Sequence, residues 1–310
     1  MFGGSWQRSV RKKIQRDNDS LKFRIGEAAL LSQKAASGAF VHLWDAEVQV
    51  YSQWGEDGIL DFLCDCLGLA KPRVLELGAG NFAECNSRFL AEHRNASVVA
   101  VDARKDLSEI MRSIPLYWRT SLFPIEDWIT PESAPLLLSK AKSLMSEVDI
   151  ISLDIDGNDY WVAESLDMAG VQLFVVEYNA LLGHEQPVTV PRDDRFDRAT
   201  AHSTWLYFGV SLRAWVYLFE QRGFTFIGTN RAGCNAFFCE SEQARKIPLS
   251  KPSTIDLAPY VDWRVRESRD PEGNLSYLAG PDRVDAIGSL PLVNVVTGEM
   301  TSVFLANSCD

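Results

Sequence analysis

A run of apolar residues that ends in acid is the feature that most constrains the fold of this chain. Residues 148–153 read Val-Asp-Ile-Ile-Ser-Leu, and their length and β-branching are typical of a central strand in a parallel sheet. Asp154 and Asp156 follow, two positions apart, so both carboxylates point to one face if the strand continues that far. Because ligands of open α/β sheets bind outside the carboxyl ends of the strands, we interpret this acid as part of a site.

Length and composition limit the kind of protein. The chain has 310 residues, enough for one large domain or two small ones, and its net charge of −11 argues against binding to nucleic acid. No apolar stretch reaches the roughly 18 residues of a transmembrane helix, and the N-terminus lacks the apolar core of a secretory signal. The six cysteines show no metal-binding spacing, so we expect reduced thiols in a cytoplasmic protein: Cys64, Cys66, Cys85, Cys234, Cys239 and Cys309.

Residues 1–48 form a segment that we expect to be a helical arm. Seven Lys or Arg and two Asp fall within residues 1–25, and apolar residues recur there at helical spacing: Trp6, Val10, Ile14 and Leu21. A second helix is expected over residues 25–37, before Gly38. The arm is either a solvated terminal helix or a contact surface for an acidic partner, an anionic membrane or a second subunit of a homo-oligomer.

Strands and helices alternate between residues 49 and 248, which we expect to form one α/β domain. Strands are predicted at seven places: residues 73–77, 97–102, 116–120, 148–153, 171–179, 224–228 and 235–239. Residues 125–128 are predicted to be a loop, and residues 181–208 a long binding loop or lid. Residues 249–310 are rich in turn-forming residues, so we expect an appendage that packs on this domain.

A glycine turn follows the first of these strands. Gly78 and Gly80 come directly after it, a helix is predicted next, and the second strand ends at Asp102. This order and distance are typical of a βαβ unit that places its acid on a ribose hydroxyl. The full dinucleotide fingerprint is not present, because Asn81 and Ala83 stand where further glycines are expected. The prediction therefore depends on the order of the elements rather than on the glycine pair alone.

Two segments resemble known methyltransferases. Residues 76–80, Glu-Leu-Gly-Ala-Gly, together with Asp102, are similar to the first motif and the second-strand acid of class I S-adenosylmethionine methyltransferases. Residues 52–58, Ser-Gln-Trp-Gly-Glu-Asp-Gly, resemble the opening motif of FkbM-type methyltransferases, which are often associated with O-methylation of sugars or polyketides. The resemblance covers roughly residues 50–240. It implies a Rossmann-like fold with a seven-stranded, mostly parallel sheet and helices on both faces.

The resemblance also implies which residues bind the cofactor S-adenosylmethionine. The two glycines would let the backbone approach the methionine end of the cofactor. Asp102, at the end of the second strand, would accept hydrogen bonds from the ribose hydroxyls, and Asp127 would accept one from the adenine amine. The residues implied are Gln53, Glu56, Glu76, Gly78, Gly80, Asp102 and Asp127. For Glu76 and Asp102 a helix-capping or turn role is the alternative, and for Gln53 and Glu56 a capping role.

Oxygen-bearing side chains end two adjacent predicted strands. Asp154 and Asp156 end one, and Glu177 and Asn179 end the next. Similar enzymes hold Mg²⁺ between these two strand ends, and a hard cation prefers carboxylate and amide oxygens. The resemblance therefore implies Mg²⁺ that orients and acidifies an acceptor hydroxyl, although related catechol enzymes have adjacent Asp-Asn in place of Glu-Tyr-Asn. A metal-free pocket that hydrogen-bonds its substrate is the alternative.

The long loop carries two candidates for a general base. His184 and His202 lie in it, and imidazole suits deprotonation of a hydroxyl near neutral pH; Asp156 is a third candidate. The first hypothesis is therefore an O-methyltransferase for a hydroxyl of a sugar, a glycan precursor or a natural product. The alternatives are a metal-independent O- or N-methyltransferase of the same fold and a non-catalytic protein that binds a ligand or partner.

Overall fold

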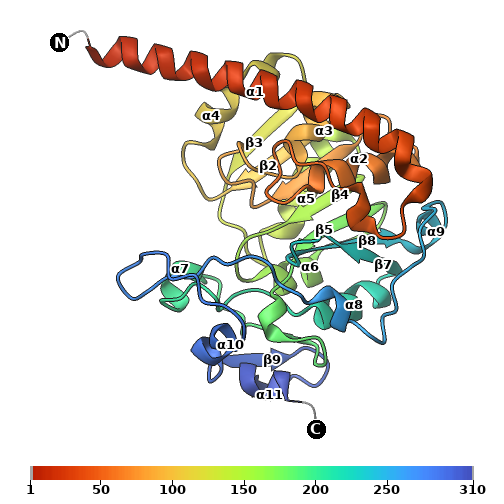
Figure 1. The fold of residues 1–310 in the computed structure, drawn as a ribbon, viewed down its shortest axis with the longest axis vertical. Coiled ribbons are helices and arrows are strands. Elements are labelled where there is room, and N and C mark those ends of the chain that lie inside the picture. The colour runs from red at the N-terminus through yellow and green to blue at the C-terminus, as the bar shows by residue number, and fades with distance from the viewer. Residues whose placement is uncertain (1–2, 309–310) are drawn as a thin grey trace.

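The computed structural model describes residues 3–308, apart from the side chains of residues 3–12, 15, 16 and 37. Its centre is a sheet of seven strands in the order β3-β2-β1-β4-β5-β8-β7 (Figure 1). The strands are β1 Arg73–Leu77, β2 Ser97–Asp102, β3 Leu122–Glu126, β4 Ile150–Leu153, β5 Leu173–Glu177, β7 Phe224–Thr229 and β8 Asn235–Glu240. Neighbouring strands are parallel except for β8, which runs antiparallel to both β5 and β7.

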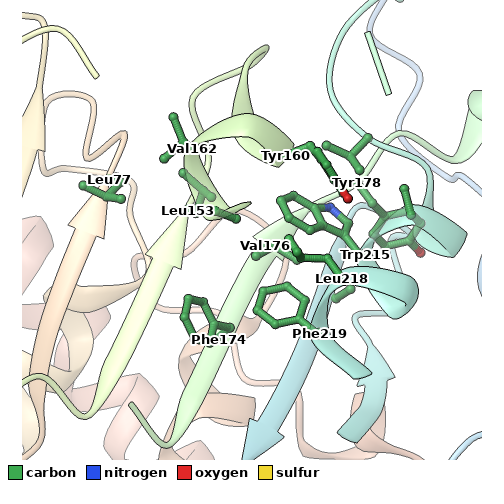
Figure 2. Close-up of a cluster of buried hydrophobic side chains, with 14 of the residues drawn as sticks. Leu77, Leu153, Tyr160, Val162, Phe174, Val176, Tyr178, Trp215, Leu218 and Phe219 are labelled. Atoms are coloured by element: carbon green, nitrogen blue, oxygen red, sulfur yellow. The ribbon is translucent and has the colours of Figure 1, made fainter. Parts of the chain in front are cut away.

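Helices cover both faces of the sheet because strand residues are apolar on both sides. In β2, Val98 faces one cluster of buried side chains and Val99 faces the other. The first face is covered by α2 Glu56–Leu67, α3 Ser87–His93 and α4 Leu107–Ser113. The second is covered by α5 Ala134–Met145, α6 Asp159–Ser165 and α8 Leu212–Gln221. There the ring of Phe219 in α8 lies 4.8 Å from that of Phe174 in β5 (Figure 2).

The strand order with one antiparallel strand is that of the Rossmann-like class I methyltransferase fold. The fold class predicted from the sequence is therefore confirmed. Six of the predicted strands overlap observed ones. The described cysteines are free thiols, and Cys309 lies outside the described residues.

The third strand is not where the sequence analysis placed it. Residues 116–120 lie largely in a short 3-10 helix, Pro115–Trp118, and β3 overlaps the segment predicted to be a loop. Pro124 lies inside β3 and weakens the strand pattern in the sequence. A proline is tolerated here because β3 is at the edge of the sheet and pairs with β2 alone.

The two predicted N-terminal helices are one helix, α1 Gly3–Ala36. Gly26 lies where a break was expected, since glycine weakens a helix interior. It serves as a contact point instead, because a Cβ added to it would lie 2.3 Å from the Cγ2 of Val50. The backbone of α1 continues through this position and crosses the α3 side of the domain (Figure 1).

A second, smaller sheet joins the long loop to the C-terminal segment. It has the order β10-β9-β6, with β6 Val188–Thr189 in the loop and a hairpin of β9 Pro291–Asn294 and β10 Met300–Ser302. The remaining short helices are α7 Arg198–Ala201, α9 Ser241–Ala244, α10 Pro281–Ile287 and α11 Val303–Asn307, the last two beside this sheet (Figure 1). Within the described part of the chain, none of the helices combines the length and apolarity that crossing a membrane requires.

The turn after β1 brings the two central strands together. Gly78 has a φ of +92°, and a Cβ placed on it would lie 1.6 Å from the carbonyl oxygen of Asp154, directly after β4. Gly80 also has a positive φ, +53°, but nothing lies within 4 Å of an added Cβ. Any side chain at position 78 would therefore push β1 away from β4. A side chain at position 80 would clash with nothing, and its cost would come only from the left-handed backbone conformation.

We expect Gly78→Ala to lower the free energy of unfolding by about 3 kcal/mol or more, because its clash is with backbone and no side-chain rotation relieves it. Gly80→Ala is the matched control and should cost about 1–2 kcal/mol for its left-handed backbone alone. Urea unfolding followed by circular dichroism measures both values. Equal losses in the two variants would contradict the close approach at Gly78.

Candidate functional site

Two adjoining cavities open at the carboxyl ends of the central strands. The first has a volume of about 390 Å³ and the second about 410 Å³. Gly78, Gly80 and Asp102 line the first, whereas Glu177 and Arg198 line the second. The two adjoin and share six lining residues, and we call them together the hollow: Gln53, Trp128, Asp154, Ile155, Asp156 and Phe196.

Hydrogen bonds hold the glycine turn against β2. The N–H of Gly78 donates to the carbonyl oxygen of Val101 at 2.9 Å. The carboxylate of Asp102 accepts from the N–H of Gly80 at 2.7 Å and from that of Arg104 at 2.9 Å. Asp102 therefore stabilises the turn, and it also lines the first cavity.

Three carboxylates meet between β4 and β5. Asp154, Asp156 and Glu177 each have an oxygen within 4.8 Å of one in each of the others, and we call them the acid cluster. The two strands are parallel neighbours, and the pairing of Leu153 with Val176 places the next residue of each side by side. β4 ends at Leu153 and Asp156 has a φ of +58°, so a turn rather than strand alternation brings Asp156 into the cluster.

Asp154 and Asp156 of the acid cluster line both cavities, and Glu177 lines the second. Burial raises the pKa of Asp154 well above its usual range, and the charges of Asp156 and Asp159 raise it further. The pKa of Glu177 is also raised, first by burial and then by the charge of Asp154. Like charges this close repel, so the cluster favours either a bound cation or a proton.

Arg198, in α7, places its positively charged guanidinium group against this cluster. Its Nη1 donates to Oδ1 of Asp156 at 2.6 Å, and its Nε donates to the carbonyl oxygen of Trp205 at 2.6 Å. Its guanidinium carbon lies 3.8 Å from the ring centre of Phe208. The sequence analysis missed Arg198, because a loop without periodicity does not indicate which of its arginines turns inward.

The donor set of the acid cluster fits a divalent cation that prefers oxygen. Carboxylates are hard donors of the kind that Mg²⁺ and Mn²⁺ favour. The three carboxylates together with Arg198 carry a formal charge of −2, which a divalent cation balances. The predicted metal ligands Asp154, Asp156 and Glu177 are thus brought together.

Asn179 is not brought to the cluster. Its Nδ2 donates to the carbonyl oxygens of Leu206 and Phe208 at 2.9 and 3.0 Å, and its Oδ1 accepts from the N–H of Leu181. β5 ends at Glu177, so strand alternation no longer applies two residues later. The buried Asn179 side chain anchors the long loop instead of facing the hollow.

The two predicted cofactor-binding glutamates are buried outside the hollow. Glu76 lies on the face of β1 toward α3 and accepts from the N–H of Asn86 at 2.7 Å, at the start of that helix. Glu56 accepts from the side chains of Asn230 and Asn235 at 2.6 and 2.9 Å, which ties α2 to the β7–β8 hairpin. In this structure the capping alternative describes Glu76, and Glu56 holds the loop before α2 in place.

Of the other two predicted cofactor residues, one reaches the hollow. Gln53 lines both cavities. Asp127 is exposed directly after β3, and its Oδ1 accepts from the N–H of Trp128 at 2.9 Å. The two residues that follow it, Trp128 and Ile129, line the first cavity in its place.

Neither predicted histidine lines the two cavities. His184 pairs with Glu185, with 2.9 Å between Nε2 and Oε1. His202 directly follows α7, and its Nδ1 lies 2.8 Å from the Oγ1 of Thr204. Among the three predicted bases, Asp156 is the one that lines both cavities.

Residues 192–205, which we call the lid segment, are fastened to the loops after β3 and β4. Nε1 of Trp128 donates to the carbonyl oxygen of Asp194 at 2.7 Å, and the side chain of Asn158 exchanges hydrogen bonds with the backbone of Asp193. Phe196 lines both cavities and lies 2.3 Å from where a Cβ of Gly157 would be. The length of the loop indicated a binding role, but its sequence did not single out Phe196.

Comparison with known proteins finds a likeness of fold. No family model matches this chain, and no curated protein is significantly similar to it. Similar solved structures include the N-terminal domain of EvdMO1 in the presence of SAH and D-fucose (10% identity, 59% of this chain and 81% of that one, TM-score 0.36). Others are cofactor-bound Rv0187 from MTB (16%, 69% and 90%, 0.37) and the fibrillarin/Nop5p complex (15%, 64% and 88%, 0.32). At TM-scores this low these similarities support no conclusion by themselves; the strand order assigns the fold to the class I methyltransferase type.

Proposed function

We propose that this protein is an S-adenosylmethionine-dependent methyltransferase that acts on a hydroxyl group with the help of a divalent cation, Mg²⁺. The observation that carries the proposal is the adjoining of the two cavities: the glycine turn and Asp102 line the first, and the acid cluster lines the second. Methyl transfer requires the donor and the acceptor oxygen in one dry space, aligned for direct attack. Two adjoining cavities of this kind would bring the donor and the acceptor oxygen close to each other.

The first cavity offers what the cofactor needs. The glycine turn lets the backbone come close to a ligand, and Asp102 has oxygens for the ribose hydroxyls. Trp128 and Ile129 give an apolar wall that suits an adenine ring. S-adenosylmethionine, when bound, would supply an electrophilic methyl group on its sulfonium.

The acid cluster is the proposed cation site. A divalent cation held by Asp154, Asp156 and Glu177 would supply Lewis acidity that lowers the pKa of an acceptor hydroxyl. Without a cation, Asp156 would be the proton acceptor, since it lines both cavities. Arg198 fixes the position of that carboxylate through their 2.6 Å ion pair.

The second cavity would receive the acceptor. Its walls combine aromatic rings with carboxylates: Trp128, Phe196, Trp205, Asp156, Glu177 and Glu267. Aromatic faces and carboxylate oxygens suit a compound with several hydroxyls, so we propose a sugar, a glycan precursor or a hydroxylated natural product. A cation-independent methyltransferase is the second candidate, because Arg198 already balances one charge of the acid cluster.

Asp102→Asn should weaken the binding of S-adenosylhomocysteine about tenfold or more, because a neutral amide accepts weaker hydrogen bonds from ribose hydroxyls than a carboxylate does. Asp106→Asn is the matched control, since Asp106 is an exposed acid that pairs with Arg104 outside the hollow. Titration calorimetry gives both dissociation constants. The cofactor site is wrong if the two variants bind equally well, or if the unchanged protein does not bind.

Glu177→Gln should weaken the binding of Mn²⁺ at least about tenfold, because it removes one of three charged donors from the cation. Glu84→Gln is the control, since Glu84 lines the first cavity and does not belong to the acid cluster. Electron paramagnetic resonance of free Mn²⁺ measures the affinity without any acceptor.

Removal of divalent ions separates the two candidate functions. If the cation takes part, EDTA abolishes methyl transfer from labelled S-adenosylmethionine to hydroxylated acceptors, and Mg²⁺ restores it. Full activity in EDTA would favour the cation-independent candidate.

A further inference from the structure

The second half of α1 is fastened firmly to the protein. Lys34 forms ion pairs with Asp61 and Asp65 at 3.1 and 2.9 Å, and Asp19 pairs with Arg88 at 2.6 Å. From there the helix continues toward its N-terminus past the edge of the domain, where it stands clear of the rest of the chain (Figure 1). The direction in which α1 projects is therefore fixed by these contacts.

Apolar packing against the domain determines which face of α1 points to solvent. The ring of Phe23 lies 5.9 Å from that of Phe89, and Leu30 is fully buried in the same cluster. Leu21 and Ile25 each stand two residues from Phe23, which at 3.6 residues per turn places them on the opposite side of the helix. The outward face is thus the one that carries Leu21 and Ile25.

Apolar side chains continue along this outward face. Ile14, Leu21 and Ile25 are 54%, 58% and 61% exposed, and we call them the outward stripe. Their spacing of seven and four residues keeps them on one side of the helix. A row of large apolar side chains that the described part of the chain leaves exposed is typical of an interaction surface.

We propose that the outward stripe of α1 packs against the outward stripe of a second copy of this chain, antiparallel, around a two-fold axis near Leu21. Asp17 and Arg24 are exposed and lie beside the stripe at nearly equal distances from Leu21 along the helix. In the antiparallel pair Asp17 comes next to Arg24 of the partner subunit, and the two-fold axis repeats that ion pair. The stripe and its flanking charges are therefore self-complementary.

The charges favour a second copy over an anionic membrane. Residues 1–25 contain seven Lys or Arg and two Asp, whereas the whole chain has a net charge of −11, so the rest of the protein is strongly acidic. Antiparallel pairing lays the basic half of each helix toward the acidic domain of the other copy. An anionic bilayer would repel that domain, and Asp17 beside the stripe would have to enter the headgroup layer.

Sedimentation velocity at micromolar concentration tests the pairing. The unchanged protein should have twice the mass of the 34.7 kDa chain. Leu21→Glu and Ile25→Glu should each halve that mass, because they place like charges in an apolar contact. Leu136→Glu is the matched control, since Leu136 is 72% exposed on α5, and it should leave the mass unchanged. Circular dichroism checks that all variants stay folded.

A charge exchange tests the antiparallel register. Asp17→Arg should weaken the dimer, and the double variant with Arg24→Asp should restore it, because the ion pair re-forms with its charges exchanged. A wild-type monomer, a dimer that survives the stripe variants, or the absence of rescue would overturn the proposal. A wild-type monomer that co-sediments with phosphatidylserine vesicles, and loses this binding in Leu21→Glu, would assign the stripe to a membrane instead.

Discussion

The approach of the backbone at Gly78 to the carbonyl oxygen of Asp154 is the constraint on which the rest of the site depends. A Cβ at position 78 would lie 1.6 Å from that oxygen, so β1 and β4 reach this distance only with glycine there. The approach joins the proposed cofactor end of the hollow to its acidic end. β5 is the next parallel neighbour of β4, and this strand pairing alone places Glu177 beside Asp154.

The acid cluster costs the folded protein stability. Its carboxylates are partly desolvated and repel one another, which is why the pKa values of Asp154 and Glu177 are raised. Arg198 offsets part of this repulsion through its ion pair with Asp156 and is itself held by the ring of Phe208. A sequence keeps such an arrangement where a ligand uses it, since buried apolar residues of the same volume would stabilise the fold more.

The frame of the site could be predicted from the sequence more fully than its side chains. Apolar runs located β2 and the last residues of β4, because buried parallel strands are apolar on both faces. The edge strand β3 was missed because it contains Pro124. Glu76 points toward α3 rather than to the hollow, and Asn179 lies beyond its strand, so both depend on local geometry that residue type does not reveal. The contact of Arg198 with Asp156 could not be predicted, because it depends on the three-dimensional path of the lid segment.

The proposed function requires that the methyl donor and the cation lie side by side in the hollow. Nuclear magnetic resonance of S-adenosylmethionine labelled with ¹³C at its methyl group, bound to the protein and titrated with Mn²⁺, tests this most directly. We expect strong paramagnetic broadening of the methyl signal in the unchanged protein, and little broadening in Glu177→Gln at the same Mn²⁺ concentration. A bound methyl signal that stays sharp while Mn²⁺ occupies the unchanged protein would contradict it.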